Sequence, residues 1–421
     1  MKTNGAIQLY PLVRMTAILI IGILIASHFV GNISYISWLI GTAVALLLSI
    51  LVRHDTIQSV LVMLVVFLLG GSLMSRSCQN QSLTTEETST FYKARQTALS
   101  VREQLVDRFR KAGLTDQEMA VVSAMVLGDK SHINKELRQD YSRTGASHVL
   151  ALSGLHLSII YFVFSLMTER WRRRYHHGLR PVIEGTILLT IWAYVFLVGL
   201  SSSVVRAAIM ITVYSLLSLQ NRNKASLNTL AFAALIMLVV QPMNIFDIGF
   251  QLSFVAVAFI LLFERHIYSL LSPLKNPVLR WLWRLTSVSL SAQLGVAPLT
   301  AYYFHQVSCS FLLTNFVVVV ITTLIIYLSL LFFLLMWLPV VQTWIVVPLT
   351  ALTRLQNTFL QQIASLPGSA IEHIHLHPLQ VLMVYVIIFA LYAMIYRISL
   401  YKRNKMCNFG FAELTHARKN K

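Results

Sequence analysis

Two histidines and a serine lie at the start of a long apolar run. His148, Ser153 and His156 precede apolar residues that continue to Met167. Ser153 and His156 are three residues apart, so on a helix they would share a face. Such a pair could act as a nucleophile with its base, or it could line a polar path. Because polar groups are costly in hydrocarbon, we expect them to face a bundle interior or an aqueous cavity.

The catalytic interpretation requires an oxyanion hole and a nucleophile placed at a sharp turn. The sequence around Ser153 is Ala-Leu-Ser-Gly-Leu, which is not the nucleophile-elbow pattern. A serine followed by a glycine, here Gly154, more often permits close packing of membrane helices. We therefore predict no catalytic residue and no enzyme, and keep an intramembrane hydrolase using Ser153 and His156 as the alternative.

An arginine and several serines mark the start of a second apolar run. Arg206 follows Gly199 and a serine cluster that includes Ser203. The glycine and serines predict a turn or a helix start, which leaves the guanidinium about one turn inside the outer end of the run. Arg206 either extends toward the lipid headgroups or lines a polar path for phosphate groups.

A third polar cluster begins the apolar run after residue 246. Asp247 is a candidate helix cap, while Gln251 and Ser253 are candidates for hydrogen bonding between helices. Gln293 is a lone amide inside a later run, and His305 lies just beyond that run. Together these residues place polar groups near the outer half of several apolar segments, as an aqueous vestibule would need.

Three alternate histidines could in principle bind a metal. His373, His375 and His377 could share one face of a strand. No carboxylate completes a known hydrolase pattern around them, so we predict neither a metal nor another cofactor. The three cysteines of the chain match no metal or disulfide framework.

The composition is that of a membrane protein. Of 421 residues, 56% are hydrophobic and 12% are charged, against about 25% charged in soluble domains. The mean hydropathy is +0.68 and the formal charge is +18. We attribute most of this charge to cytoplasmic loops rather than to nucleic-acid binding. Apolar segments lie near 11–31, 35–52, 57–74, 147–167, 182–199, 203–219, 227–241, 249–263, 286–304, 311–337, 340–353 and 378–397.

These segments predict an all-α polytopic integral membrane protein with about 10–12 transmembrane helices. The basic clusters near residues 53, 170–180, 222–224, 265–284 and 402–405 all fall on one side, which predicts cytoplasmic termini. The segment 75–145 then faces outward. Within it we expect a loop at 79–90, an amphipathic surface helix at 91–110, and a further helix over 118–127 with a capping box formed by Thr115 and Glu118.

Five of these stretches, taken together and in order, resemble the ComEC family of competence proteins. The matching stretches are 124–130, 145–156, 199–210, 247–256 and 293–306, so the resemblance covers about 116–320. The resemblance implies a multi-pass channel in the inner (cytoplasmic) membrane that passes single-stranded DNA into the cell during natural transformation. It divides the chain into an N-terminal three-helix segment (1–75), an extracytoplasmic helical segment (76–145), a competence core (146–400) and a basic cytoplasmic tail (401–421).

On this resemblance we expect the polar stretches to line the DNA path. The candidate residues are His148, Ser153, Gly154, His156, Ser203, Arg206, Phe250, Gln251, Ser253, Gln293 and His305. Longer relatives carry an OB-like domain and a metallo-β-lactamase-like domain, for which we find no room at 75–115 or after 397. The expected partners are therefore a separate periplasmic DNA receptor, a nuclease, and a cytoplasmic motor or single-strand-binding protein, with a homo-oligomer possible. A small-solute transporter is a further alternative, although no inverted repeat is visible.

Overall fold

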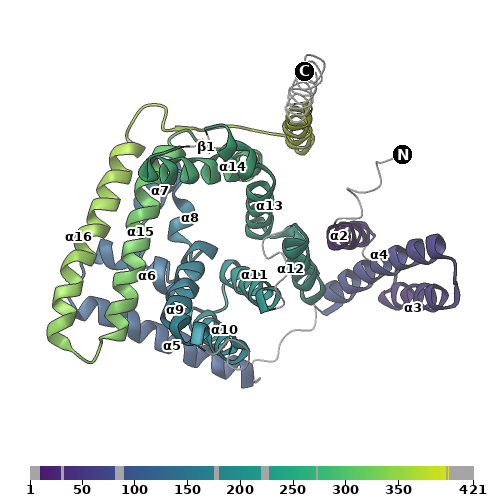
Figure 1. Cartoon of the computed structure of the whole chain (residues 1–421), viewed down its shortest axis with the longest axis horizontal. Helices are drawn as coiled ribbons and strands as arrows, with labels where there is room; N and C mark the ends of the chain where they lie inside the picture. The colour runs from purple at the N-terminus through teal and green to yellow at the C-terminus, as the bar shows by residue number, and fades with distance from the viewer. Residues whose placement is uncertain are drawn as a thin grey trace, which may run out of the picture.

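The chain folds into a bundle of helices. The computed structural model describes residues 10–29, 33–80, 90–174, 180–219, 227–271, 274–394 and 397 (Figure 1). Among these residues the only strands are two short ones, β1 (Val307–Ser308) and β2 (Ala370–Ile371). The predicted basic tail 401–421, the clusters at 222–224 and 402–405, and residues 81–89 of the predicted loop lie outside the described residues. The all-α prediction is confirmed.

The predicted apolar segments form helices. They are α2 (Pro11–His28), α3 (Tyr35–Leu51), α4 (Asp55–Asn80), α10 (Arg180–Leu197), α11 (Ser202–Leu219), α12 (Leu227–Val240), α13 (Ile248–Ser269), α14 (Pro277–Phe304), α15 (Phe311–Leu334), α16 (Pro339–Ala364) and a last helix, Pro378–Met394. Within the described residues, five helices are long and apolar enough to cross a membrane: α2, α4, α10, α13 and α15. The chain is therefore a polytopic membrane protein, and the expected 10–12 crossings stay a prediction.

The apolar helices leave much of their surface uncovered by the chain. In the apolar windows of those five helices, only 22–39% of residues are buried. On α3, Ile50 and Leu51 are 70% and 66% exposed. A soluble protein rarely exposes such continuous apolar surface, whereas a bilayer covers it without cost.

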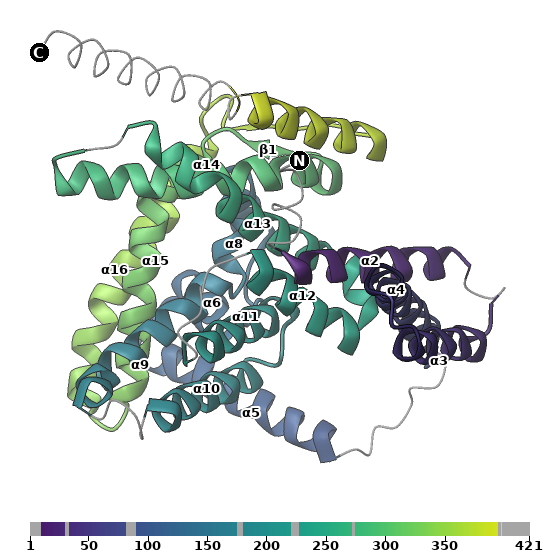
Figure 2. The ribbon, with the colours of Figure 1, turned by 45° about the vertical axis from the view of Figure 1, so that its right-hand side comes forward.

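The N-terminal helices α2 and α4 are in close backbone contact, and α3 packs on α4. A Cβ atom on Gly22 would lie 2.2 Å from the carbonyl oxygen of Phe67, and one on Gly70 would lie 2.6 Å from that of Leu19. Only glycine permits this approach. Figure 2 shows this three-helix group extending from the rest of the chain, to which α2 is joined through α12.

The segment after α4 forms α5 (Thr90–Lys111), α6 (Asp116–Leu127) and α7 (Lys135–Arg143). The predicted helix at 91–110 is present, but it does not lie free on a surface. Phe109 is fully buried and its ring lies 5.0 Å from those of Phe332 and Phe333 at the end of α15.

The predicted helix over 118–127 is present as part of α6, and every residue from Glu118 to Leu127 is buried. The predicted capping box is wrong. Thr115 occupies the N-cap position without a side-chain capping bond, and Glu118 pairs with Arg354 of α16 instead of returning to its own helix. The ion pair with the distant Arg354 replaces the local capping contact of Glu118.

The predicted continuous segment 147–167 is broken. Residues Ser147–Leu150 form the short helix α8, and three residues separate it from α9 (Gly154–Arg174). Helices α9, α10 and α11 then pack together around buried residues that include Leu157, Ile191 and Val204. Helix α11 lies at the centre of the molecule, because it contacts α9, α10, α12 and α13 (Figures 1 and 2).

Helices α15 and α16 form a hairpin whose two ends are tied together. Strands β1 and β2 pair antiparallel, with Val307 opposite Ile371 and Ser308 opposite Ala370. The amide of Ile374 donates to the carbonyl of His305 at 3.0 Å, which extends the pairing. We call this arrangement the β clasp.

Candidate functional site

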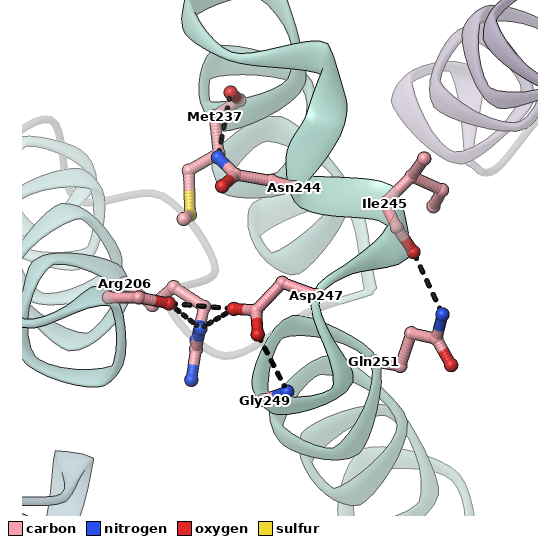
Figure 3. Close-up of polar contacts among 8 residues, drawn as sticks. Arg206, Met237, Asn244, Ile245, Asp247, Gly249 and Gln251 are labelled. Carbon is pink, nitrogen blue, oxygen red and sulfur yellow. Dashed lines mark hydrogen bonds and ion pairs between the residues drawn. The ribbon is translucent and has the colours of Figure 1, made fainter. Parts of the chain in front are cut away.

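A buried arginine joins α11 to α13. The Nη1 of Arg206 donates to Oδ2 of Asp247 at 2.9 Å, and also to the hydroxyl of Ser202 one turn earlier (Figure 3). The Ser202 hydroxyl donates to the same carboxylate oxygen at 2.7 Å. Arg206 is only 4% exposed, so its side chain does not extend to the lipid headgroups. Its charge is instead neutralised inside the protein.

Asp247 has a second role as the N-cap of α13. Its Oδ1 accepts the N–H of Gly249 at 3.1 Å, as the sequence predicted for a cap (Figure 3). Burial raises the pKa of Asp247, but hydrogen bonds from Ser202 and Gly249 and the charge of Arg206 outweigh it, so the pKa lies below its ordinary value. The carboxylate is therefore ionised at neutral pH and fixes both helices.

Gly249 leaves space for the guanidinium group. A Cβ at this position would lie 2.9 Å from Nη2 and 3.4 Å from Nη1 of Arg206. The Nε of Arg206 is buried and has no hydrogen-bond partner in the described part of the chain. The Nε–H donor of the buried Arg206 guanidinium is thus unsatisfied beside the ion pair.

The break between α8 and α9 is stabilised by a histidine. Nδ1 of the buried His156 accepts the backbone N–H of Ser153 at 3.1 Å. The hydroxyl of Ser153 and Nε2 of His156 are both buried without a partner among the described residues. The two side chains therefore do not form the hydrogen bond that a nucleophile and its base require.

The first turn of α9 lies against α11. A Cβ on Gly154 would lie 3.5 Å from the Cβ of Ala207, which directly follows Arg206. The packing role expected for the Ser-Gly pair is thus observed. The predicted stretches 148–156, 199–206 and 247–253 all converge on the first turns of α11.

Residues of α13 connect this region to α14. Gln251 donates through Nε2 to the carbonyl of Ile245 at 2.9 Å (Figure 3) and accepts the hydroxyl of Tyr303 at 2.6 Å. The predicted hydrogen-bonding role of Gln251 is confirmed. Phe250 is buried and its ring lies 4.3 Å from that of Phe254, so it is a packing residue in this structure.

The remaining candidates lie outside these contacts. Ser203, Ser253 and Gln293 are half-buried. His148 is exposed on α8, where its Nδ1 lies 3.0 Å from the carbonyl of Gly145. The serine that meets the ion pair is Ser202, which we did not single out. Its position four residues before Arg206 on one helix was the available signal.

His305 belongs to the β clasp. It ends α14 in the left-handed backbone conformation, with φ 57°, and its ring stacks on that of His375 at 4.9 Å. His373 also has a positive φ, of 63°, so the 373–377 segment is not a regular strand with three histidines on one face. No group of three histidine, cysteine or acidic residues in the described part of the chain could hold a metal.

Sequence comparisons identify relatives of this chain. The chain is 34% identical over 211 residues to ComE operon protein 3 of Bacillus subtilis (strain 168), covering 50% of this chain and 25% of that protein. It is 26% identical over 230 residues to Recombination protein 2 of Haemophilus influenzae, covering 52% and 29%. An uncharacterised protein of Aquifex aeolicus is 29% identical over 220 residues, covering 51% and 48%.

The chain thus spans a quarter to a half of the length of these relatives. No solved structure matches it. The family described as Competence protein matches residues 125–398, which include the α8–α9 break, the Arg206–Asp247 pair and the β clasp. Since this match covers well over half of its residues, the chain belongs to the Competence protein family.

Proposed function

We propose that this chain forms a membrane pathway by which single-stranded DNA enters the cytoplasm during natural transformation. The observation that carries the proposal is the overlap between the family match and the place where the polar stretches meet. The family match at 125–398 contains all three polar stretches that meet at the start of α11. Polar groups that meet inside a polytopic membrane protein favour a transport path.

Within this proposal the candidate residues have different roles. A path for single-stranded DNA needs basic groups that contact the phosphates and aromatic faces that stack on the bases. His148 and His305 are exposed and can meet the strand. Tyr302 and Tyr303, whose rings lie 4.8 Å apart, offer aromatic faces.

The buried candidates act by holding the path open rather than by touching DNA. Arg206 is already paired with Asp247, and Gly154 and His156 fix the start of α9. We assign the same structural role to Phe250 and Gln251. The half-buried Ser203, Ser253 and Gln293 and the break residue Ser153 complete the proposed lining.

Catalysis is the less favoured candidate. The Ser153 hydroxyl makes no hydrogen bond to His156, whose Nδ1 is occupied by a backbone amide. A serine without a base is a weak nucleophile. We therefore propose that the chain is a channel and not a hydrolase.

The cellular setting follows from the same proposal. We place the chain in the cytoplasmic membrane with both termini inside, because the basic clusters fall on one side of the expected spans. The proposed partners are a DNA receptor outside, a nuclease for the second strand, and a cytoplasmic motor or single-strand-binding protein. Self-association is part of this proposal.

The test is a clean deletion of the gene in its own host, complemented by the wild-type chain. Labelled double-stranded DNA is supplied, and DNA outside the cytoplasmic membrane is separated from DNA inside it. We expect DNA to bind the deletion strain without reaching the cytoplasm, and transformants to return with the wild-type copy. Normal transformation by the deletion strain would contradict the proposal.

A further inference from the structure

A polar cavity lies between α6, α7 and α16, apart from the Arg206–Asp247 pair. Its volume is about 280 Å³. The lining residues that carry most of its chemistry are Glu118, Asn134, Glu136, Asp140, Arg354 and Asn357. This volume lies just below the roughly 300 Å³ at which sites for drug-sized ligands begin, so the cavity has room only for a smaller molecule.

One carboxylate oxygen in this lining is unpaired. Glu118 is 5% exposed, and its Oε1 accepts Nε of Arg354 at 3.1 Å. Its Oε2 is buried and has no hydrogen-bond donor among the described residues. The side chain of Arg354 is 65% exposed, so solvent screens part of its charge. A buried carboxylate oxygen without a donor is costly, and a ligand that donates a hydrogen bond removes that cost.

The charge of the lining is opposite to that of the chain. Three carboxylates face one guanidinium in the cavity, whereas the whole chain carries a formal charge of +18. Burial and the neighbouring Glu136 raise the pKa of Asp140, an effect that Arg143 partly offsets. Such a site repels phosphates and attracts cations.

The wall behind the carboxylates is fixed by hydrogen bonds. Asn357 accepts the hydroxyl of the fully buried Tyr141 at 2.8 Å, and that hydroxyl accepts Nε2 of Gln356 at 3.2 Å. Asn134 caps α7 by accepting the amide of Leu137 at 2.8 Å. The cavity is therefore preorganised, which lowers the entropic cost of binding.

The carboxylates of the cavity do not form a metal site. No three acidic or histidine groups in the described residues lie close enough to hold a metal ion. Carboxylates spaced around a cavity instead suit a cation that carries several N–H donors on one short chain.

We propose that this cavity binds a small organic cation with two or more ammonium groups, of the size of a short polyamine. On binding, the carboxylate of Glu118 turns its buried Oε2 toward the cavity and accepts a hydrogen bond from one ammonium group, and another ammonium group meets Glu136 or Asp140. This inference goes beyond the DNA pathway and does not depend on it.

The test uses the full chain purified in detergent micelles. Thermal unfolding is followed with increasing putrescine or spermidine, with 1,4-butanediol as an uncharged probe of similar length, and with MgCl₂ at matched ionic strength. We expect a saturable rise of the unfolding midpoint with the amines alone. An equal rise with butanediol or MgCl₂, or no rise with the amines, overturns the proposal.

Variants locate the binding site. Glu136→Gln and Asp140→Asn should each weaken amine binding by about tenfold, because each removes one charged partner of the ligand. Asp107→Asn is the matched control, since Asp107 pairs with Arg110 on the exposed surface of α5, away from the cavity lining. Glu118→Gln also breaks the pair with Arg354, and a variant that fails to fold gives no binding result. The test therefore relies on Glu136→Gln, which leaves that pair intact. Unchanged amine affinity in the Glu136→Gln/Asp140→Asn double variant contradicts the proposal.

Discussion

Arg206 and Asp247 are 41 residues apart in the chain, yet Nη1 of one lies 2.9 Å from Oδ2 of the other. The arginine side chain is 5% exposed and the aspartate side chain 39%. This pair links the start of α11 to the start of α13, while Gly154 packs against the next residue of α11. One ion pair thus holds together the region where the polar stretches of the family meet.

Removing the arginine should loosen this region. Arg206→Ala leaves the carboxylate of Asp247 without its cation, and we expect a loss of about 2–3 kcal/mol in unfolding free energy. Transformation should be abolished while the protein is still inserted in the membrane. The measurements are thermal unfolding in detergent and transformation frequency. Arg14→Ala is the control, because the contact of Arg14 to the sulfur of Met63, at 3.8 Å, is weak and its side chain is exposed. Wild-type stability and transformation frequency of Arg206→Ala would contradict the structural role of this arginine.

Adding one methyl group beside the guanidinium should have a related effect. In Gly249→Ala the new Cβ would lie 2.9 Å from Nη2 of Arg206, so the arginine must move and its pair weakens. We expect a lower unfolding midpoint and fewer transformants. Gly185→Ala on α10 has open space around its Cβ and should be neutral or stabilising by up to about 1 kcal/mol. Equal effects of the two variants would contradict the steric argument.

The hydroxyl of Tyr303 should matter more than that of its neighbour. Tyr303→Phe removes the 2.6 Å bond to Oε1 of Gln251, at a cost of about 1 kcal/mol. Tyr302→Phe keeps the ring contact between the two tyrosines and removes no hydrogen bond found in the described residues. The measurement is the unfolding midpoint of both variants, and we expect a larger decrease for Tyr303→Phe than for Tyr302→Phe. An equal loss in both would remove the special role of Tyr303.

The serine of the α8–α9 break should be dispensable as a nucleophile. His156 accepts the backbone N–H of Ser153, and Ser153→Ala keeps that N–H. We therefore expect normal transformation by Ser153→Ala and no labelling of the wild-type chain by a fluorophosphonate probe. Labelling that disappears in Ser153→Ala would favour the hydrolase. His156→Ala, by contrast, removes the acceptor at the break and should reduce transformation.

Acid should weaken the Arg206–Asp247 pair. The pKa of Asp247 is lowered from 3.8 in the folded chain, so the stability that the ionised carboxylate contributes is present above that value and is lost as the pH falls through the folded pKa. The difference in unfolding midpoint between the wild type and Asp247→Asn should stay constant near neutral pH. It should shrink only below pH 3.8. A difference that vanishes between pH 6 and 5 would require another titrating group.

The sequence predicted the helices well because their signal is local. The apolar runs define the helices, the position of Asp247 predicts a cap, and the amide of Gln251 predicts hydrogen bonding inside a span. Each of these depends on neighbouring residues. The break at Ser153 was missed because the apolar pattern continues through it, and it is the capping contact from His156 that accommodates the turn.

Contacts between distant segments were beyond prediction. Glu118 and Arg354 are separated by 236 residues, and no periodicity connects them. The sequence placed Glu118 in a local capping box, and the polar cavity that it lines has no pattern in the chain. The partner of Arg206 was unpredictable for the same reason, because only the packing of α11 on α13 brings a carboxylate to it.

The β clasp closes the α15–α16 hairpin at its base. The chain enters the hairpin after Ser308 and leaves it before Ala370, which are paired neighbours, so the base of the hairpin is fixed. The hairpin between these strands is packed into the core, because the rings of Phe332 and Phe333 meet Phe109 of α5 and Arg354 pairs with Glu118 of α6. A change of length in α15 or α16 would therefore keep the base of the hairpin but lose these contacts unless α5 and α6 changed with it.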